Sequence, residues 1–107
     1  MRVRVTPYPD RDADGEQNVT DNADAGRYEI TVDGKLAGFV DYTDGERTRA
    51  LTHTEVDDAF GGQGVGGRLA QGALDDIRQQ GKQVSPICPF IKGWIDKHPD
   101  YQDLVAA

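Results

Sequence analysis

The sequence predicts an α/β (α+β) domain with a mixed sheet, in which an antiparallel meander leads into a β-α-β unit and a C-terminal helix. Three observations carry this prediction. Alternating apolar residues separated by turn signals predict three successive strands between residues 27 and 56. An amphipathic helix follows over residues 64–80, and a short apolar strand and a second helix come after it. A strand, a crossover helix and a strand predict a parallel pair.

The first 26 residues carry the weakest pattern. Arg2–Val5 alternates as a short edge strand does, and residues 6–26 are rich in Asp, Asn and Gly. Val19 is the centre of one candidate strand, and a partly disordered acidic arm is the alternative interpretation. We expect a single domain over residues 1–107, of which residues 1–26 are a weakly structured segment.

The meander is clearer. Residues 27–32 alternate, and Asp33-Gly34 supplies a two-residue hairpin turn that tolerates positive φ at both positions. The second strand is expected over residues 36–42. After a further turn at Asp44-Gly45, the third strand is expected over residues 48–56.

The helix at 64–80 ends at Gly81, a residue typical of the position after a helix. Residues 82–87 then predict a strand. Pro89 suits the first position of the last helix, and Pro99 ends that helix. The buried stripe expected for the first helix is Val65, Leu69, Ala70, Ala73, Leu74 and Ile77.

Composition excludes several classes of protein. A net charge of −7 argues against nucleic acid as a partner. The single Cys excludes an intramolecular disulfide and favours a reducing compartment. Neither a secretion leader nor an apolar run near 20 residues is present, so the expectation is a cytoplasmic protein with no membrane partner.

Residues 61–67 form a glycine-rich turn in which five of seven residues are Gly. Backbone there can approach a ligand closely, and the following helix points its free N–H groups at the turn. Such a turn binds an anion, most often a phosphate or pyrophosphate. The alternative is that the glycines only permit tight packing of strand and helix.

Two other phosphate-binding patterns fit less well. Gly62, Gly64 and Gly67 satisfy G-x-G-x-x-G, but no carboxylate stands near Ile87, where a dinucleotide site needs one for the ribose. An ATPase-type loop needs Lys followed by Ser or Thr, whereas this chain has Arg68 and then Leu.

Three side chains are candidates for catalysis. Cys88 stands at the start of the last helix, where the helix dipole favours a thiolate. Alternatively, Cys88 serves only as a small buried apolar residue. By simple alternation His53 and Glu55 share one face of the third strand with Leu51, either as a base with its orienting partner or as solvated surface residues. Thr52 and Thr54 lie on the other face, and only one set can face the site. The two His and one Cys have no metal-site spacing.

Four pieces of the chain together resemble a minimal-length subfamily of the GNAT acetyltransferases. The pieces are His53-Thr54-Glu55-Val56, Gly62-Gln63-Gly64-Val65-Gly66, Cys88-Pro89-Phe90 and His98-Pro99-Asp100-Tyr101. The resemblance runs from about Tyr28 to Val105 and follows the element order of the acetyl-CoA-binding half of those enzymes.

The resemblance implies that backbone N–H groups of the turn hold the pyrophosphate of acetyl-CoA. It also implies that the two strands diverge after Val56, with pantetheine pairing to backbone there and the thioester reaching Cys88, the candidate catalytic residue of the subfamily. The cofactor-binding residues so implied are Val56, Gly62, Gln63, Gly64, Val65, Gly66 and Gly67.

Two departures from the wider pattern concern binding. Gly61 stands where the family has Arg or Gln, and the helical segment between the first two strands is missing. No strong base appears beyond His53 and Glu55. The expected function is acetyl-CoA-dependent N-acetylation of an amine, on a small molecule or a protein lysine. The alternative is a CoA-binding or interaction module without transfer activity.

Overall fold

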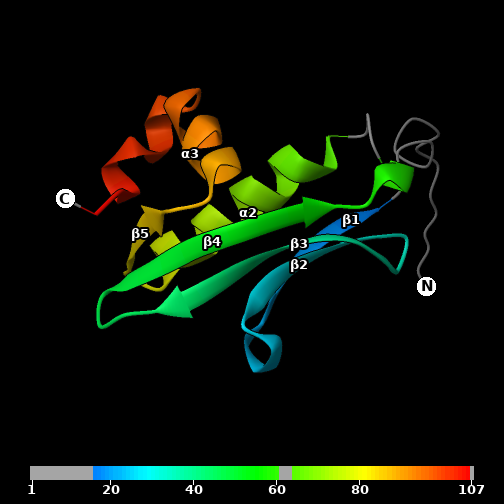
Figure 1. Ribbon diagram of the computed structural model, residues 1–107, viewed down its shortest axis with the longest axis horizontal. Coiled ribbons are helices and arrows are strands. Elements are labelled where there is room, and N and C mark those ends of the chain that lie inside the picture. The colour runs from blue at the N-terminus through cyan, green and yellow to red at the C-terminus, as the bar shows by residue number, and fades with distance from the viewer. Residues whose placement is uncertain (1–15, 61–63, 107) are drawn as a thin grey trace.

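The computed structural model describes residues 16–60 and 64–106 (Figure 1). Their elements in chain order are β1 (Gln17–Asn22), η2 (Ala23–Ala25), β2 (Arg27–Val32), β3 (Lys35–Asp44), β4 (Thr48–Val56), η3 (Asp58–Phe60), α2 (Val65–Gln79), β5 (Gln83–Pro86), α3 (Pro89–Asp96) and η4 (Pro99–Leu104). The sheet has the order β1-β2-β3-β4-β5 and is antiparallel except for the parallel pair β4–β5. The predicted mixed α/β sheet is confirmed.

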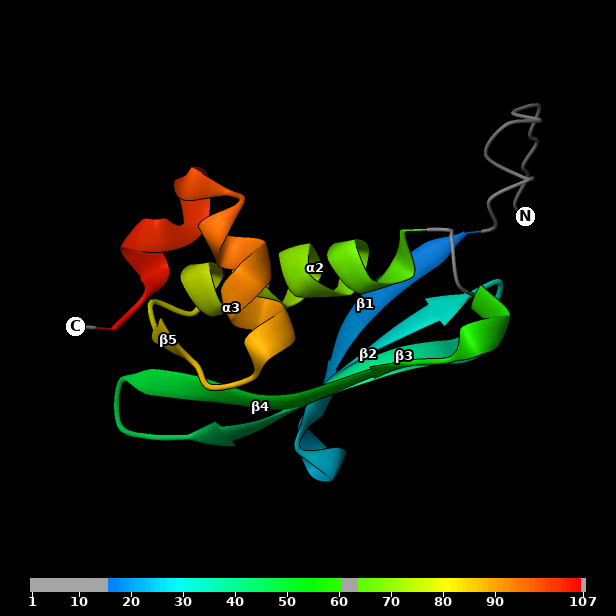
Figure 2. The ribbon, with the colours of Figure 1, turned by 45° about the horizontal axis from the view of Figure 1, so that its top comes forward.

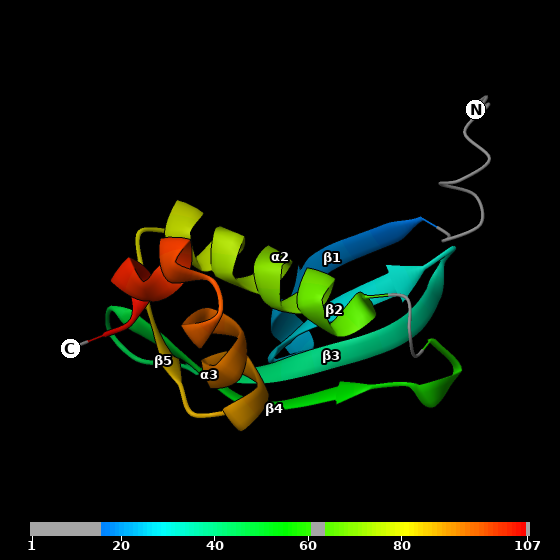
Figure 3. The same cartoon turned by 90° about the horizontal axis from the view of Figure 1, so that it is seen from above.

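Helices α2 and α3 lie on the same face of the sheet (Figures 2 and 3). The apolar stripe predicted for α2 is buried in full against the strands. The largest fully buried side chains are Tyr28, Ile30, Val40, Leu51, Val65, Leu69, Leu74, Ile77, Val84 and Ile91. The core therefore lies between α2, α3 and the sheet, and the opposite sheet face carries mostly polar side chains, with Phe39 among them.

The N-terminal segment is more ordered than expected where it is described. Residues 17–22 pair along their whole length with β2, so the candidate strand around Val19 exists and the expectation of weak structure is wrong for residues 17–25. Val19 packs against Gly72 of α2, where a β-carbon would lie 2.7 Å from the Val19 side chain. Long-range packing thus orders a segment whose local pattern is weak. Arg2–Val5 lies outside the described residues.

The turn chemistry is confirmed at two places. Asp33 and Gly34 have φ of 51° and 83°, as the hairpin turn between β2 and β3 requires. Gly81 has φ of 73° and its N–H bonds the Arg78 carbonyl, which ends α2 as predicted.

Arg49 anchors the first half of β4. It is only 5% exposed, and its Nε donates to Asp44 at 2.6 Å while Nη1 donates to the Tyr28 hydroxyl at 2.8 Å. Its guanidinium also lies 4.0 Å from the ring centre of Tyr42 and forms an ion pair with Asp21 at 3.3 Å. This cluster ties β1, β2, β3 and β4 together at one end of the sheet.

Candidate functional site

A β-bulge divides β4 in two. Tyr42 pairs with Leu51 and Asp41 pairs with His53, so Thr52 is an extra residue in the strand. The Thr52 hydroxyl donates to the Asp41 carbonyl at 3.3 Å across this irregularity. An extra residue reverses the alternation of side chains beyond it. The prediction that His53 and Glu55 share a face with Leu51 is therefore wrong.

The ladder between β4 and β5 stops at the same place. Its last pair is Leu51 with Pro86, and proline has no N–H with which to continue it. The chain then turns outward at Ile87, which is 62% exposed, and returns so that the Cys88 N–H donates to the Leu51 carbonyl at 2.9 Å. The two strands thus diverge after Leu51, five residues earlier than the resemblance implied.

Thr54 and Cys88 meet beyond this point. The Thr54 Oγ1 lies 3.2 Å from the Cys88 Sγ, and Cys88 is only 4% exposed. Cys88 is the N-cap of α3, with Pro89 at the first helical position, as predicted. Because of the bulge, Thr54 points to the face that carries the helices.

The surroundings of the sulfur favour the thiolate. Burial alone raises the pKa of the Cys88 thiol. The Thr54 hydroxyl and the main-chain N–H groups of Ile91, Phe90 and Thr54 stabilise the charged form and together lower the pKa below its ordinary value. Cys88 is therefore a better proton donor and a better nucleophile than an ordinary buried thiol.

His53 and Glu55 lie on the opposite face of β4. The Nε2 of His53 lies within hydrogen-bond distance of Glu55 Oε2, at 2.8 Å, and the two side chains are 56% and 63% exposed. The Phe39 ring of β3 lies 6.3 Å from the His53 ring. The structure thus brings two of the three predicted catalytic residues together and places Cys88 across the strand from them.

The start of α2 has the features of an anion site. Gly64 is the N-cap with φ of 72°, it has no side-chain cap, and a β-carbon there would have no heavy atom within 4 Å. Val65 is the first helical residue, and its side chain is buried in the core. Its main-chain N–H therefore stands in the first turn of the helix. The predicted contacts of Gly62 and Gln63 lie outside the described residues.

Gly66 connects this helix start to the thiol. A β-carbon at residue 66 would lie 3.0 Å from the Phe90 ring and 3.7 Å from Cγ2 of Val56. At Gly67 it would lie 3.5 Å from the Trp94 indole nitrogen. The glycines of the first turn therefore permit close packing on α3. The anion-binding interpretation of the turn stays a prediction, with which the open backbone at Gly64 is compatible.

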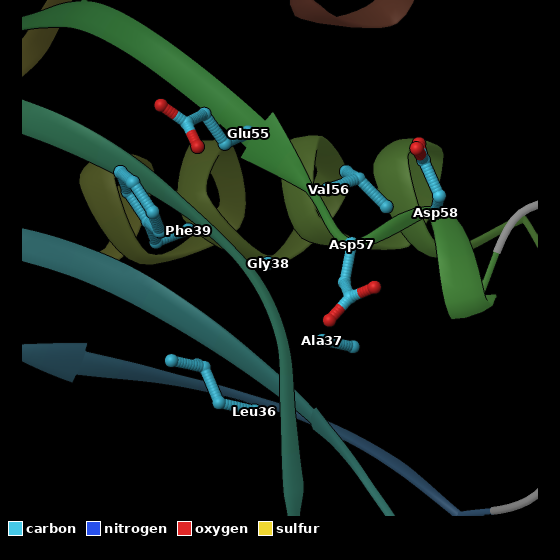
Figure 4. Close-up of a pocket in the computed structure, with 8 residues that line it drawn as sticks. All are labelled: Leu36, Ala37, Gly38, Phe39, Glu55, Val56, Asp57 and Asp58. Carbon is cyan, nitrogen blue, oxygen red and sulfur yellow. The ribbon is translucent and has the colours of Figure 1, made fainter.

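A pocket of about 410 Å³ lies between the start of β3 and the end of β4 (Figure 4). Phe39 of β3, Glu55 of β4 and Asp57, the residue after β4, project around it. Its lining residues are Leu36, Ala37, Gly38, Phe39, Glu55, Val56, Asp57 and Asp58. The pocket combines an apolar surface with three carboxylates, which suits a cationic group attached to an apolar chain.

The sequence predicted Thr54 only as one of two alternatives, because no Gly or other local signal marks the bulge at Thr52.

Among residues 16–60 and 64–106, no three His, Cys, Asp or Glu side chains are grouped to hold a metal ion. In the same described part, no helix has the length and apolar character needed to cross a bilayer.

Comparisons with known proteins agree with this geometry. Residues 27–104 match the family described as GCN5-related N-acetyl-transferase. Protein NATD1 from Xenopus tropicalis and from Homo sapiens are each 34% identical to the chain over 55 residues, which is 51% of this chain and 50% and 49% of theirs. The chain thus matches these relatives over about half of their length.

A solution structure of a GCN5-like protein from Staphylococcus aureus has the same fold. It superposes with a TM-score of 0.65 at 24% identity and covers 84% of this chain and 88% of that chain. With the match to residues 27–104, the chain belongs to the GCN5-related N-acetyl-transferase family.

Proposed function

We propose that the chain transfers an acetyl group from acetyl-CoA to an amine. One observation carries the proposal: Gly66 in the first turn of α2 touches Phe90 in the first turn of α3. A helix start suited to an anion and a thiol of lowered pKa are therefore neighbours, which supports the proposal. Family membership adds the expectation of this reaction class.

Acetyl-CoA suits the surface between the start of α2 and the Cys88 thiol. Its pyrophosphate is negatively charged, and backbone N–H groups from Gly62 to Gly67 would hold it at the start of α2. Its pantetheine would run along residues 52–56 of β4, beyond the last pair with β5. Gln63 and Val65 belong to the same proposed binding segment.

The proposed reaction is direct attack. A cationic amine first gives one proton to solvent. Its neutral nitrogen then bonds to the acetyl carbon, the carbon–sulfur bond of the thioester breaks, and Cys88 gives its proton to the departing CoA sulfur. The amine loses a proton to solvent or to the His53–Glu55 pair, and the Cys88 thiolate regains one from solvent. Backbone N–H near Val56 polarises the thioester carbonyl.

The acceptor is proposed to be a cationic amine approaching from the open face of the sheet. Glu55, Asp57 and Asp58 line the pocket on this side of β4. Carboxylates raise the local concentration of a cation and hold it near the strand. Both a small amine and a protein lysine meet this description, and the single free thiol suits the reducing cytoplasm as the compartment.

The test is acetyl transfer by the wild-type chain and by Cys88→Ala. With acetyl-CoA and a panel of polyamines and lysine peptides, the wild type is expected to release free CoA and to add one acetyl group to an amine. Cys88→Ala is expected to be slower by roughly 10²–10⁴-fold, because it lacks the acid, at nearly unchanged CoA affinity by calorimetry. Full turnover by this variant would remove Cys88 from the mechanism.

A second candidate is a CoA-binding module without transfer activity. The burial of Cys88, at 4% exposure, favours it because the sulfur needs access to the thioester. This function predicts CoA binding with neither free CoA nor acetylated protein after incubation with acetyl-CoA. The intact mass of the protein and a free-thiol assay of the solution separate the two.

A further inference from the structure

The geometry points to Thr54 as a positioning residue that holds the Cys88 sulfur and stabilises it after proton donation. The inference rests on the acetyl transfer proposed above. It assigns a role to a side chain that neither the glycine-rich turn nor the cysteine motif includes. Thr54 acts through Cys88 and is not itself required to touch the substrate.

The bulge at Thr52 makes the contact. In a regular strand Thr54 would lie on the face opposite to Leu51. It could not then meet the side chain of Cys88, the residue whose main-chain N–H donates to the Leu51 carbonyl. The extra residue turns Thr54 to the helix face, where its hydroxyl lies 3.2 Å from the sulfur. The same turn sends His53 to the open face.

The two threonines of this region use their hydroxyls differently. Thr52 donates to the Asp41 carbonyl, which is a bond within the sheet. Thr54 directs its hydroxyl at a side chain from α3, across the space left where β4 and β5 diverge. A hydroxyl directed at a buried sulfur is suited to hold that sulfur in one orientation.

The contact serves both protonation states. In the thiol state, the Cys88 S–H donates to the Thr54 oxygen, and a hydroxyl can accept this bond. When the proton passes to the CoA sulfur, the Thr54 O–H rotates and donates to the new thiolate. Main-chain N–H groups of Phe90 and Ile91 support the same charge from the start of α3. No proton leaves Thr54, and the charge that forms on sulfur meets donors already in place.

The experiment uses the single cysteine of the full chain. Thiolate absorbance in the ultraviolet is followed against pH, with Cys88→Ala as the blank, in wild type, Thr54→Val, Thr54→Ser and the exposed control Thr43→Val. Thr54→Val removes the hydroxyl at nearly constant volume. We expect its titration midpoint to rise and its turnover number to fall by on the order of tenfold, the size of one charge-assisted hydrogen bond, at unchanged KM for acetyl-CoA.

Thr54→Ser keeps the hydroxyl and is expected to retain the wild-type midpoint and most of the turnover, as is Thr43→Val. Thr54→Ala adds no bulk and repeats the comparison if the valine variant folds poorly. An unchanged midpoint in a folded variant that lacks the hydroxyl would overturn the inference. The midpoint is measured without acetyl-CoA, so a shifted midpoint with no acetyl transfer in any variant would instead reject the proposed function.

Discussion

Gly66 and Phe90 pack against one another where the first turns of α2 and α3 meet. The contact is close enough that a β-carbon at residue 66 would lie 3.0 Å from the ring. A substitution at Gly66 therefore moves Phe90, which is two residues from Cys88, and disturbs the surroundings of the thiol together with the proposed anion site. Gly64 offers a cleaner test, because a β-carbon there meets nothing within 4 Å.

Gly64→Asp is expected to weaken CoA binding strongly, by at least about tenfold, because its carboxylate would stand at the proposed pyrophosphate site. Gly64→Asn is the matched control, since Asn also tolerates positive φ and has nearly the same shape without the charge. Calorimetric titration with CoA measures both. Equal affinities of the two variants would contradict a diphosphate site at the start of α2.

Glu55→Gln is expected to slow acetyl transfer at neutral pH by on the order of a hundredfold if the His53–Glu55 pair accepts the proton of the amine. The pair lies across β4 from the sulfur, so the titration midpoint of Cys88 should stay at its wild-type value. Asp41→Asn, a carboxylate opposite His53 in the sheet, serves as a comparison for general loss of charge. A midpoint that moves with Glu55→Gln would show that the two sides of the strand are coupled.

Gly72→Ala is expected to destabilise the fold by about 1–3 kcal/mol, because the new β-carbon would lie 2.7 Å from Val19 and force α2 away from β1. Gly93→Ala in α3 meets nothing within 4 Å and should stabilise the helix by about 0.5–1 kcal/mol. Urea unfolding of the two variants measures the difference. Similar effects of both changes would mean that the contact between α2 and β1 is looser than described.

Stability should fall in acid partly through Asp44. Its hydrogen bond with Arg49 lowers the pKa of this carboxylate below its ordinary value of 3.8. The unfolded chain then binds more protons than the folded one, so the contribution is present above the ordinary value and is lost as the pH falls through the folded value. Asp44→Asn should lower stability at neutral pH and flatten the acid decline.

Urea unfolding from neutral pH down to about pH 2 checks this expectation, with the exposed Asp24→Asn as control. An acid decline as steep in Asp44→Asn as in wild type would assign it to other carboxylates, such as Glu29, whose pKa Arg27 lowers.

The sequence predicted those parts of the fold that depend on local pattern. The alternation of residues 27–32, the Asp33-Gly34 turn and the apolar stripe of α2 each indicated the element found. It predicted β1 only weakly, because that strand depends on Val19 meeting Gly72, a contact between residues far apart in the chain.

The candidate site was predicted less completely for the same physical reason. Cys88 at the start of α3 follows from local signals, as does Gly64 at the start of α2. The partner of the sulfur depends on a bulge at Thr52, which is set by how β3 and β4 align over their whole length. Strand alternation alone therefore grouped His53 with Leu51 and left open whether His53 or Thr54 faces the site.

The early end of the pairing between β4 and β5 also bears on the behaviour of the protein at high concentration. Beyond Leu51, β4 offers main-chain donors and acceptors that no residue of β5 satisfies, and such an edge tends to recruit strands from other molecules. A ligand that pairs there would also shield the chain from self-association. Protein stored with CoA should then form fewer aggregates than protein stored without CoA.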